Sequence, residues 1–201
     1  MKVLLGRKVG MSELISEDGT TTPVTLVEAG PCVVAAKRTH EQDGYEAVVI
    51  GYGKDARPNK AQAGQFQHLD MPPKYLREVR GASDLDIGDS LDVTTFTSGD
   101  TVVVSGRSKG KGFSGTIKRH NFSRGPMTHG SRNVRRPGSI GGMYPQKVYK
   151  GRKMPGRMGG DTTTVRGLEV RAVDPERNVL AISGAVPGPK HGLLLVQGVE
   201  Q

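Results

Sequence analysis

Residues 123–142 read SRGPMTHGSRNVRRPGSIGG, and this stretch divides the chain because it cannot build a core of its own. It holds four arginines, five glycines, two prolines and no carboxylate within twenty residues. Its only sizeable apolar residues are Met127, Val134 and Ile140, which follow neither the spacing of an amphipathic helix nor the alternation of a half-buried strand. The order of this stretch must therefore come from contacts outside it.

The same composition continues on both sides, over residues 106–160. This segment contains 13 glycines and only twelve sizeable apolar residues among 55. Burial of so few apolar side chains cannot offset about 1 to 2 kcal/mol of backbone entropy per residue. A long loop of this kind is normally functional or folds on a partner. Residues 106–160 are therefore predicted to be a long, irregular, basic extension.

Short apolar runs bounded by turn residues flank the extension, and such runs are typical of strands. They lie at residues 2–5, 23–29, 32–37, 45–52 and 101–105 before it, and at 168–174, 178–186 and 192–197 after it. Many short strands without a long helix predict a mainly β chain, an antiparallel barrel or compact sandwich. Residues 1–105 and 161–201 are predicted to form this globular domain, with residues 53–73 as a polar excursion beside the sheet.

Charge is distributed as unevenly as apolar residues. Residues 1–100 carry 11 Lys/Arg and 15 Asp/Glu, and residues 161–201 carry 4 and 5. Residues 101–160 carry 14 Lys/Arg and no acid, where the chain's own frequency would give about six acids. An ordinary solvated surface mixes charges of both signs. The distribution therefore indicates a polyanionic partner for this part of the chain.

Cysteine and apolar runs point to a reducing, aqueous compartment. Cys32 is the only cysteine, which excludes an intramolecular disulfide and a thiolate zinc cage, and we expect it to be a small core residue. No stretch approaches the roughly 20 apolar residues of a membrane span. The five histidines form no i, i+4 pair for a metal. We expect a cytoplasmic protein without a metal, cofactor or membrane partner.

One glycine motif suggests an enzyme but has the wrong context. Residues 110–115, GKGFSG, match the G-x-G-x-x-G pattern and follow an apolar run. A dinucleotide site also needs an apolar helix and an acidic residue about 20 positions later, and no acid follows before Asp161. A kinase is disfavoured because the residues after Gly115 contain neither HRD nor DFG. The motif is not interpreted as a nucleotide site.

Two further hypotheses stay open from the residues alone. His120 or His129, near Ser123, Thr128 and Ser131, could act as a general base in an RNA-processing enzyme. The absence of a nearby carboxylate in sequence to orient the imidazole argues against this. The chain could also be a translation factor or chaperone that binds ribosomes reversibly. We expect no catalytic residue and no small-molecule substrate.

Contact with RNA phosphates explains all the features of the extension. Arginine binds phosphate through two donors, lysine supplies a compact charge, and glycine lets backbone N–H groups approach closely. No DNA-reading helix or finger is present, whereas folded RNA offers crevices for an irregular segment. The predicted RNA-binding residues are Arg107, Ser108, Lys109, Lys111, Lys118, Arg119, His120, Arg124, His129, Arg132, Arg135, Arg136, Lys147, Lys150, Arg152, Lys153 and Arg157.

At this point the sequence resembles a known family, the third protein of the large ribosomal subunit in its bacterial form. The resemblance spans the chain and is most specific in SGRSKGKGFSGTIKRHNFSRGPMTHGS at 105–131, RRPGSIGG at 135–142 and GRKMPGRMGG at 151–160. GRKVGM at 6–11, PVTLVEA at 23–29 and DPERNVLAISGAVPGPKHGLL at 174–194 agree as well. The residues on the family signature are Ser108, Gly110, Lys111, Gly112, Gly115 and Arg119.

The resemblance implies a barrel of the type found in translation proteins, with an extension that penetrates ribosomal RNA toward the peptidyl transferase centre. It implies a structural, non-enzymatic protein that binds near the 3′ end of the large-subunit RNA, nucleates assembly and touches neighbouring proteins fourteen and nineteen. The loop tip nearest the peptidyl transferase centre would comprise Ser123, Arg124, Gly125, Pro126, Met127, Thr128 and His129.

Two residues depart from the family pattern. Val103 stands where the signature usually has Asp or Asn, at a position expected to be a strand end. Gly125 stands where some members carry a glutamine that is methylated, so that modification is not expected here.

Overall fold

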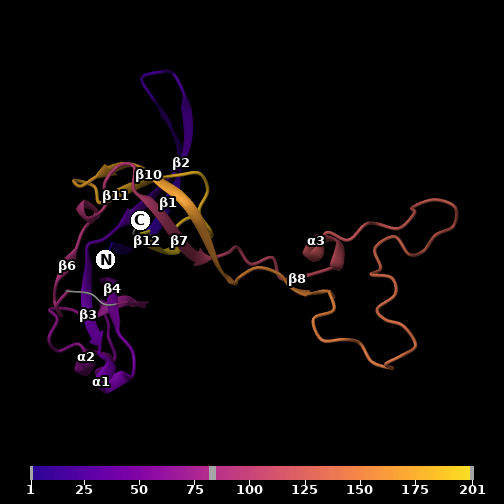
Figure 1. Ribbon diagram of the computed structural model, residues 1–201, viewed down its shortest axis with the longest axis horizontal. Coiled ribbons are helices and arrows are strands. Elements are labelled where there is room, and N and C mark those ends of the chain that lie inside the picture. Colours follow the sequence, from indigo (N-terminus) through magenta and orange to yellow (C-terminus); the bar gives the residue numbers. More distant parts are fainter. Residues whose placement is uncertain (1, 82–84, 200–201) are drawn as a thin grey trace. The chain divides into compact units, whose positions relative to one another are not determined.

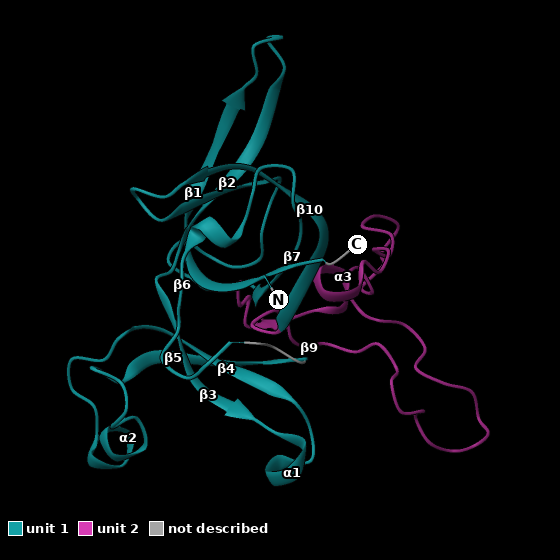
Figure 2. Cartoon of the chain, turned by 60° about the vertical axis from the view of Figure 1, so that its left-hand side comes forward, with its two compact units in different colours: residues 1–108, 162–201 teal, residues 109–161 magenta. Residues whose placement is uncertain are grey.

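The computed structural model describes residues 2–81 and 85–199 of the chain (Figure 1). The chain divides into two compact units, drawn in different colours in Figure 2. Unit 1 comprises residues 1–108 and 162–201, and unit 2 comprises residues 109–161. Each unit is described separately below.

Six strands of unit 1 form a closed barrel in the order β1-β12-β7-β10-β11-β2, and β2 pairs with β1 to complete it. All neighbouring pairs are antiparallel. The prediction of a mainly β chain is confirmed. The barrel strands are β1 (Val3–Ile15), β2 (Thr21–Ala29), β7 (Thr101–Arg107), β10 (Thr162–Asp174), β11 (Val179–Ser183) and β12 (Leu193–Gly198).

A second, four-stranded antiparallel sheet in unit 1 has the order β5-β4-β3-β6. Its connections carry short helices, as expected for a chain without long amphipathic stretches. The elements are β3 (Cys32–Arg38), α1 (His40–Asp43), β4 (Ala47–Lys54), α2 (Lys60–Gln65), β5 (Pro73–Arg80), β6 (Ser90–Leu91) and the 3-10 turn η1 (Val93–Thr95).

One hydrophobic core serves both sheets of unit 1. Barrel residues such as Leu4, Val104 and Leu194 belong to the same buried cluster as Ile50 of the small sheet and Phe96 after η1. Phe96 is among the largest fully buried side chains. Alternation along the strands places these residues inward, as in β7, where Val102 and Val104 are buried and Thr101 is exposed. Val103 is the third residue of β7 and lies within this strand, not at its end.

The polar excursion at residues 53–73 contains helix α2. Asn59 caps this helix, since its Oδ1 accepts from the Gln62 N–H at 2.8 Å and its own N–H donates to Gln62 Oε1 at 3.2 Å. Phe66 directly after the helix is buried. Pro73 opens the edge strand β5, a position where the missing N–H costs no interior ladder bond. The excursion is thus ordered by a cap and one apolar anchor.

Cys32 is a buried core residue, as the sequence predicted. Its Sγ lies 3.3 Å from both the N–H and the carbonyl oxygen of Leu5, so the thiol bridges β3 and β1. Burial raises the pKa of the Cys32 thiol to about 11. The thiol is therefore protonated and shielded, which is the behaviour of a small apolar residue.

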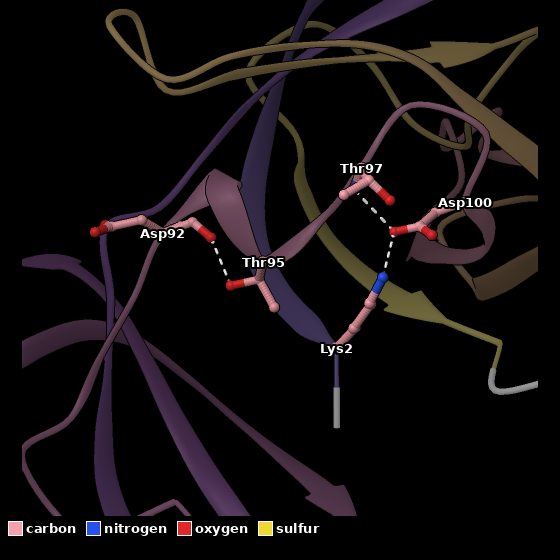
Figure 3. Close-up of polar contacts among 5 residues, drawn as sticks. All are labelled: Lys2, Asp92, Thr95, Thr97 and Asp100. Atoms are coloured by element: carbon pink, nitrogen blue, oxygen red, sulfur yellow. Dashed lines mark hydrogen bonds and ion pairs between the residues drawn. The ribbon is translucent and has the colours of Figure 1, made fainter.

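A group of polar contacts fixes the start of β1 to the turn before β7 (Figure 3). The Asp100 carboxylate accepts from Lys2 Nζ at 2.7 Å and from the Thr97 N–H at 2.9 Å. Next to it, Thr95 Oγ1 donates to the Asp92 carbonyl at 2.8 Å and closes η1. The bond from Lys2, followed by the bond from the Thr97 backbone, lowers the pKa of Asp100 below its ordinary value of 3.8.

This ion pair predicts a pH-dependent stability difference. A lowered folded-state pKa contributes stability above the unfolded value, and that contribution disappears as pH falls through the folded value. Wild type should therefore be more stable than Asp100→Asn at about pH 7, and the difference should vanish near about pH 2. Urea unfolding at both pH values measures it. Lys2→Met completes a double-mutant cycle, and additive effects of the two substitutions at neutral pH would contradict the pairing.

Candidate nucleic-acid interface

Unit 2 has little regular structure and is strongly basic. Its elements are β8 (Phe113–Ser114), α3 (Thr116–His120) and β9 (Gly156–Arg157). It carries 13 Lys/Arg and one acid, Asp161, which gives a net charge of +12. Unit 1 carries 16 Lys/Arg and 19 Asp/Glu and has a net charge of −3. Arg107 ends β7, so Arg107 and Ser108 of the predicted set lie in unit 1.

Almost all the cations of unit 2 face solvent. Arg119 is half-buried, and the other twelve are exposed: Lys109, Lys111, Lys118, Arg124, Arg132, Arg135, Arg136, Lys147, Lys150, Arg152, Lys153 and Arg157. Because residues 101–160 contain no carboxylate, these cations have no acid within their own segment to neutralise them. The resulting positive potential suits an extended polyanion.

Backbone pairing holds the two ends of unit 2 together. Phe113 and Ser114 of β8 pair with Arg157 and Gly156 of β9. Next to them the Lys111 N–H donates to the Met158 carbonyl, and the Met158 N–H donates to the Gly112 carbonyl, each at 2.9 Å. This short ribbon joins residues more than 40 positions apart in the chain without an apolar core.

Helix α3 packs onto the second half of the segment through one carbonyl group. Arg119 donates from a guanidinium nitrogen to the Met154 carbonyl oxygen at 2.8 Å, and His120 Nε2 lies 3.1 Å from the same oxygen. A carbonyl only accepts, so His120 Nε2 carries the proton and donates it to the Met154 oxygen. A Cβ at Gly156 would lie 2.8 Å from Arg119 Nη1, so a larger residue there would displace the guanidinium. Arg119 and His120 thus have structural contacts inside unit 2.

The predicted loop tip folds back on itself. The Gly125 N–H donates to the Val134 carbonyl at 3.0 Å, and a Cβ on Gly125 would lie 2.5 Å from the Asn133 carbonyl oxygen. A glutamine side chain therefore cannot be accommodated without a backbone shift, which is consistent with glycine at this position. A hollow of about 700 Å³ opens beside this contact, lined by Ser123, Arg124, Gly125, Asn133, Arg136, Pro137 and Gly138.

The fold of this loop places Arg124 and Arg136, twelve positions apart in the chain, in the lining of one hollow. His129, by contrast, is exposed and adopts a left-handed backbone with φ of 56°. Arg152 donates to the Ser139 carbonyl at 2.7 Å and closes a second turn of the loop. The predicted site residues therefore lie along unit 2 and at the end of β7, and they are not gathered into one pocket.

Several large apolar side chains of unit 2 lie in solvent. The exposed fractions are 81% for Phe113, 70% for Met127, 92% for Met143, 89% for Tyr144 and 66% for Tyr149. Side chains of this size normally pack or bind, and flat aromatic rings suit stacking on nucleobases. Met143 was not singled out by sequence reasoning, and only its exposure in the structure draws attention to it.

Other site types find no support among the described residues. No group of three or more His, Cys, Asp or Glu at positions 2–81 and 85–199 is arranged to hold a metal ion. In the same part of the chain no helix has both the length and the apolar character needed to cross a membrane.

Comparison with known proteins gives a consistent result. A family model described as ribosomal protein L3 matches residues 83–178, which include all of unit 2. The large ribosomal subunit protein uL3 of Heliobacterium modesticaldum is 52% identical over 201 residues, covering 98% of this chain and 96% of the relative. The protein of the same name from Carboxydothermus hydrogenoformans is 50% identical, covering 98% of this chain and 96% of the relative. The one from Shouchella clausii is 49% identical, covering 98% of this chain and 97% of the relative.

Proposed function

Because the chain belongs to the uL3 family of large ribosomal subunit proteins, we propose that it is a structural, non-enzymatic component of the large subunit whose unit 2 binds ribosomal RNA. The observation that carries this proposal is the charge of unit 2, with 13 Lys/Arg against one acid and twelve of the cations exposed. When these cations bind RNA phosphates, their mutual repulsion is removed and counterions are released from the RNA.

The residues of unit 2 divide into two roles in this proposal. The exposed lysines and arginines contact phosphates, and Arg124 and Arg136 do so together at the hollow of the loop tip. Arg119 and His120 act on the protein side, because their contacts with Met154 hold α3 in place. Ser108 and Arg107, at the end of β7, would contact RNA where the chain enters unit 2.

The finer assignments rest on the family resemblance. The barrel would be of the translation-protein type, with unit 2 as an extension that penetrates the ribosomal RNA. Binding would occur near the 3′ end of the large-subunit RNA, early in assembly, with Ser123–His129 nearest the peptidyl transferase centre. Neighbouring proteins fourteen and nineteen are the proposed protein contacts, and the cytoplasmic ribosome is the proposed location. Any effect on peptide bond formation would be indirect, through support of RNA geometry.

Binding of the purified protein to RNA over a salt titration tests the proposal. A fragment from the 3′ domain of large-subunit RNA is compared with an unrelated folded RNA of equal length. If about eight phosphates are neutralised, the slope of log K against log salt concentration should be about −6 to −7. We expect a preference for the 3′ fragment that persists at high salt. Equal affinity for both RNAs at every salt concentration would refute specific binding near the 3′ end.

A further inference from the structure

The hairpin of β1 and β2 continues well beyond the barrel. β1 pairs with β12 only from Val3 to Arg7, and β2 pairs with β11 only from Val24 to Glu28. Beyond both ranges the two strands pair only with each other, from Glu13 opposite Pro23 to Ile15 opposite Thr21. Figures 1 and 2 both show this end of the hairpin standing clear of the rest of unit 1. We call residues 9–22 the hairpin tip.

The hairpin tip exposes apolar side chains. The exposed fractions are 41% for Val9, 54% for Met11, 36% for Leu14 and 73% for Ile15. Val9 lies at a bulge between Lys8 and Gly10, where the bend carries β1 out of the barrel. A two-stranded ribbon without a packed face is only marginally stable in water. The exposed apolar residues therefore indicate a surface that is covered by a partner.

The charge of the hairpin tip is opposite to that of unit 2. It carries Glu13, Glu17 and Asp18, all exposed, and no lysine or arginine. Lys8, the nearest cation before it, is buried and donates from Nζ to the Val186 carbonyl at 3.1 Å. Three carboxylates would repel RNA phosphates, whereas they complement a basic protein surface.

We propose that the hairpin tip is a protein-docking surface that binds another protein of the large subunit through an apolar patch rimmed by lysine or arginine. The proposal rests on the proposed function, since it takes the large subunit as the setting. Met11 and Ile15 supply the apolar contact, and the three carboxylates select the basic partner and exclude RNA. The chain thus has two interaction surfaces of opposite charge, one for RNA and one for protein.

Site-specific photocrosslinking in assembled large subunits tests this proposal. Ile15 is replaced by p-benzoylphenylalanine, the variant is expressed in cells, and isolated subunits are irradiated. The expected crosslink joins position 15 to a different protein, at a site with lysine or arginine nearby, as mapped by mass spectrometry. A crosslink to RNA, a crosslink to a second copy of this chain, or no crosslink at all would overturn the proposal.

Two controls separate the possible failures. The same probe at Met143, 92% exposed in unit 2, should crosslink to RNA. If the chain is absent from the subunit fraction of a gradient, the proposed function has failed, and the docking proposal fails with it. If position 143 crosslinks to RNA and position 15 does not crosslink to a protein, only the docking proposal is refuted.

Charge reversal tests the chemistry of the partner. Glu13→Lys, Glu17→Lys and Asp18→Lys together should reduce the protein crosslink from position 15 about tenfold or more, since each change places like charges together. The affinity of this variant for the 3′ RNA fragment should not fall, and its melting temperature should stay within about 2 °C of wild type, because the three residues are exposed. An unchanged protein crosslink would contradict a basic partner.

Discussion

Replacement of residues 108–161 by an Asn-Gly turn is expected to give a folded barrel that has lost its affinity for RNA. Arg107 of β7 is paired with Thr162 of β10, so the two ends of the excised segment are adjacent in the sheet. Two-residue Asn-Gly turns connect such antiparallel neighbours readily. The core residues of unit 1 are all retained.

The size of both effects follows from charge and loop length. Removal of 13 exposed or half-exposed cations should lower RNA affinity on the order of a thousandfold at low salt and bring the salt slope close to zero. Shortening the connection from 54 residues to two lowers the entropy cost of loop closure, so barrel stability should hold or rise by up to about 3 kcal/mol. Filter binding and thermal unfolding measure the two effects.

Two results would contradict this prediction. Undiminished RNA binding by the excised chain would place the RNA site in unit 1, despite its net charge of −3. Loss of the near-native circular dichroism spectrum would instead mean that unit 1 needs unit 2 in order to fold.

Substitution of alanine for Phe96 should reduce stability, whereas the same substitution at Phe113 should reduce RNA affinity. Phe96 is fully buried in the core of unit 1, and Phe96→Ala should lower the free energy of unfolding by about 3 to 5 kcal/mol through lost contacts and a cavity. Phe113 is 81% exposed in unit 2, and Phe113→Ala should change stability by less than about 0.5 kcal/mol.

RNA binding should show the reverse order. If the Phe113 ring stacks on a base, Phe113→Ala should weaken binding to the 3′ RNA fragment by about 1 to 3 kcal/mol. Phe96→Ala should leave the affinity unchanged at temperatures where the protein is folded. Urea titration and filter binding on both variants give the comparison. Equal stability losses for the two variants would show that Phe113 is packed, and a loss of affinity only in Phe96→Ala would refute the division of roles between the two units.

The strands of unit 1 could largely be predicted from the sequence, and their pairing could not. Short apolar runs at residues 101–105 and 192–197 predict β7 and β12, because an apolar run bounded by turn residues is a local signal. The neighbour relation of β1 and β12, and the separation of β3 and β4 into a second sheet, depend on contacts between residues distant in sequence. The edge strand β5 was not predicted, since four of its eight residues are charged: Lys74, Arg77, Glu78 and Arg80.

The candidate site shows the same limit. The absence of acids from residues 101–160 indicates an anionic partner, because net charge is additive and needs no coordinates. The contacts of Arg119 and His120 with the Met154 carbonyl carry no sequence signal, since a backbone oxygen accepts from any donor that the fold brings near. The meeting of Arg124 and Arg136 at one hollow likewise requires the loop to be folded.

The neighbour relation of β1 and β12 also bears on the order of events during synthesis. β1 is complete at residue 15, but its barrel partner β12 runs only from residue 193 to residue 198. Unit 2 ends at residue 161 and therefore emerges before the closing strand exists. A ribosome making this chain thus exposes the basic segment while the barrel is still open, which allows RNA contact to begin before unit 1 has finished folding.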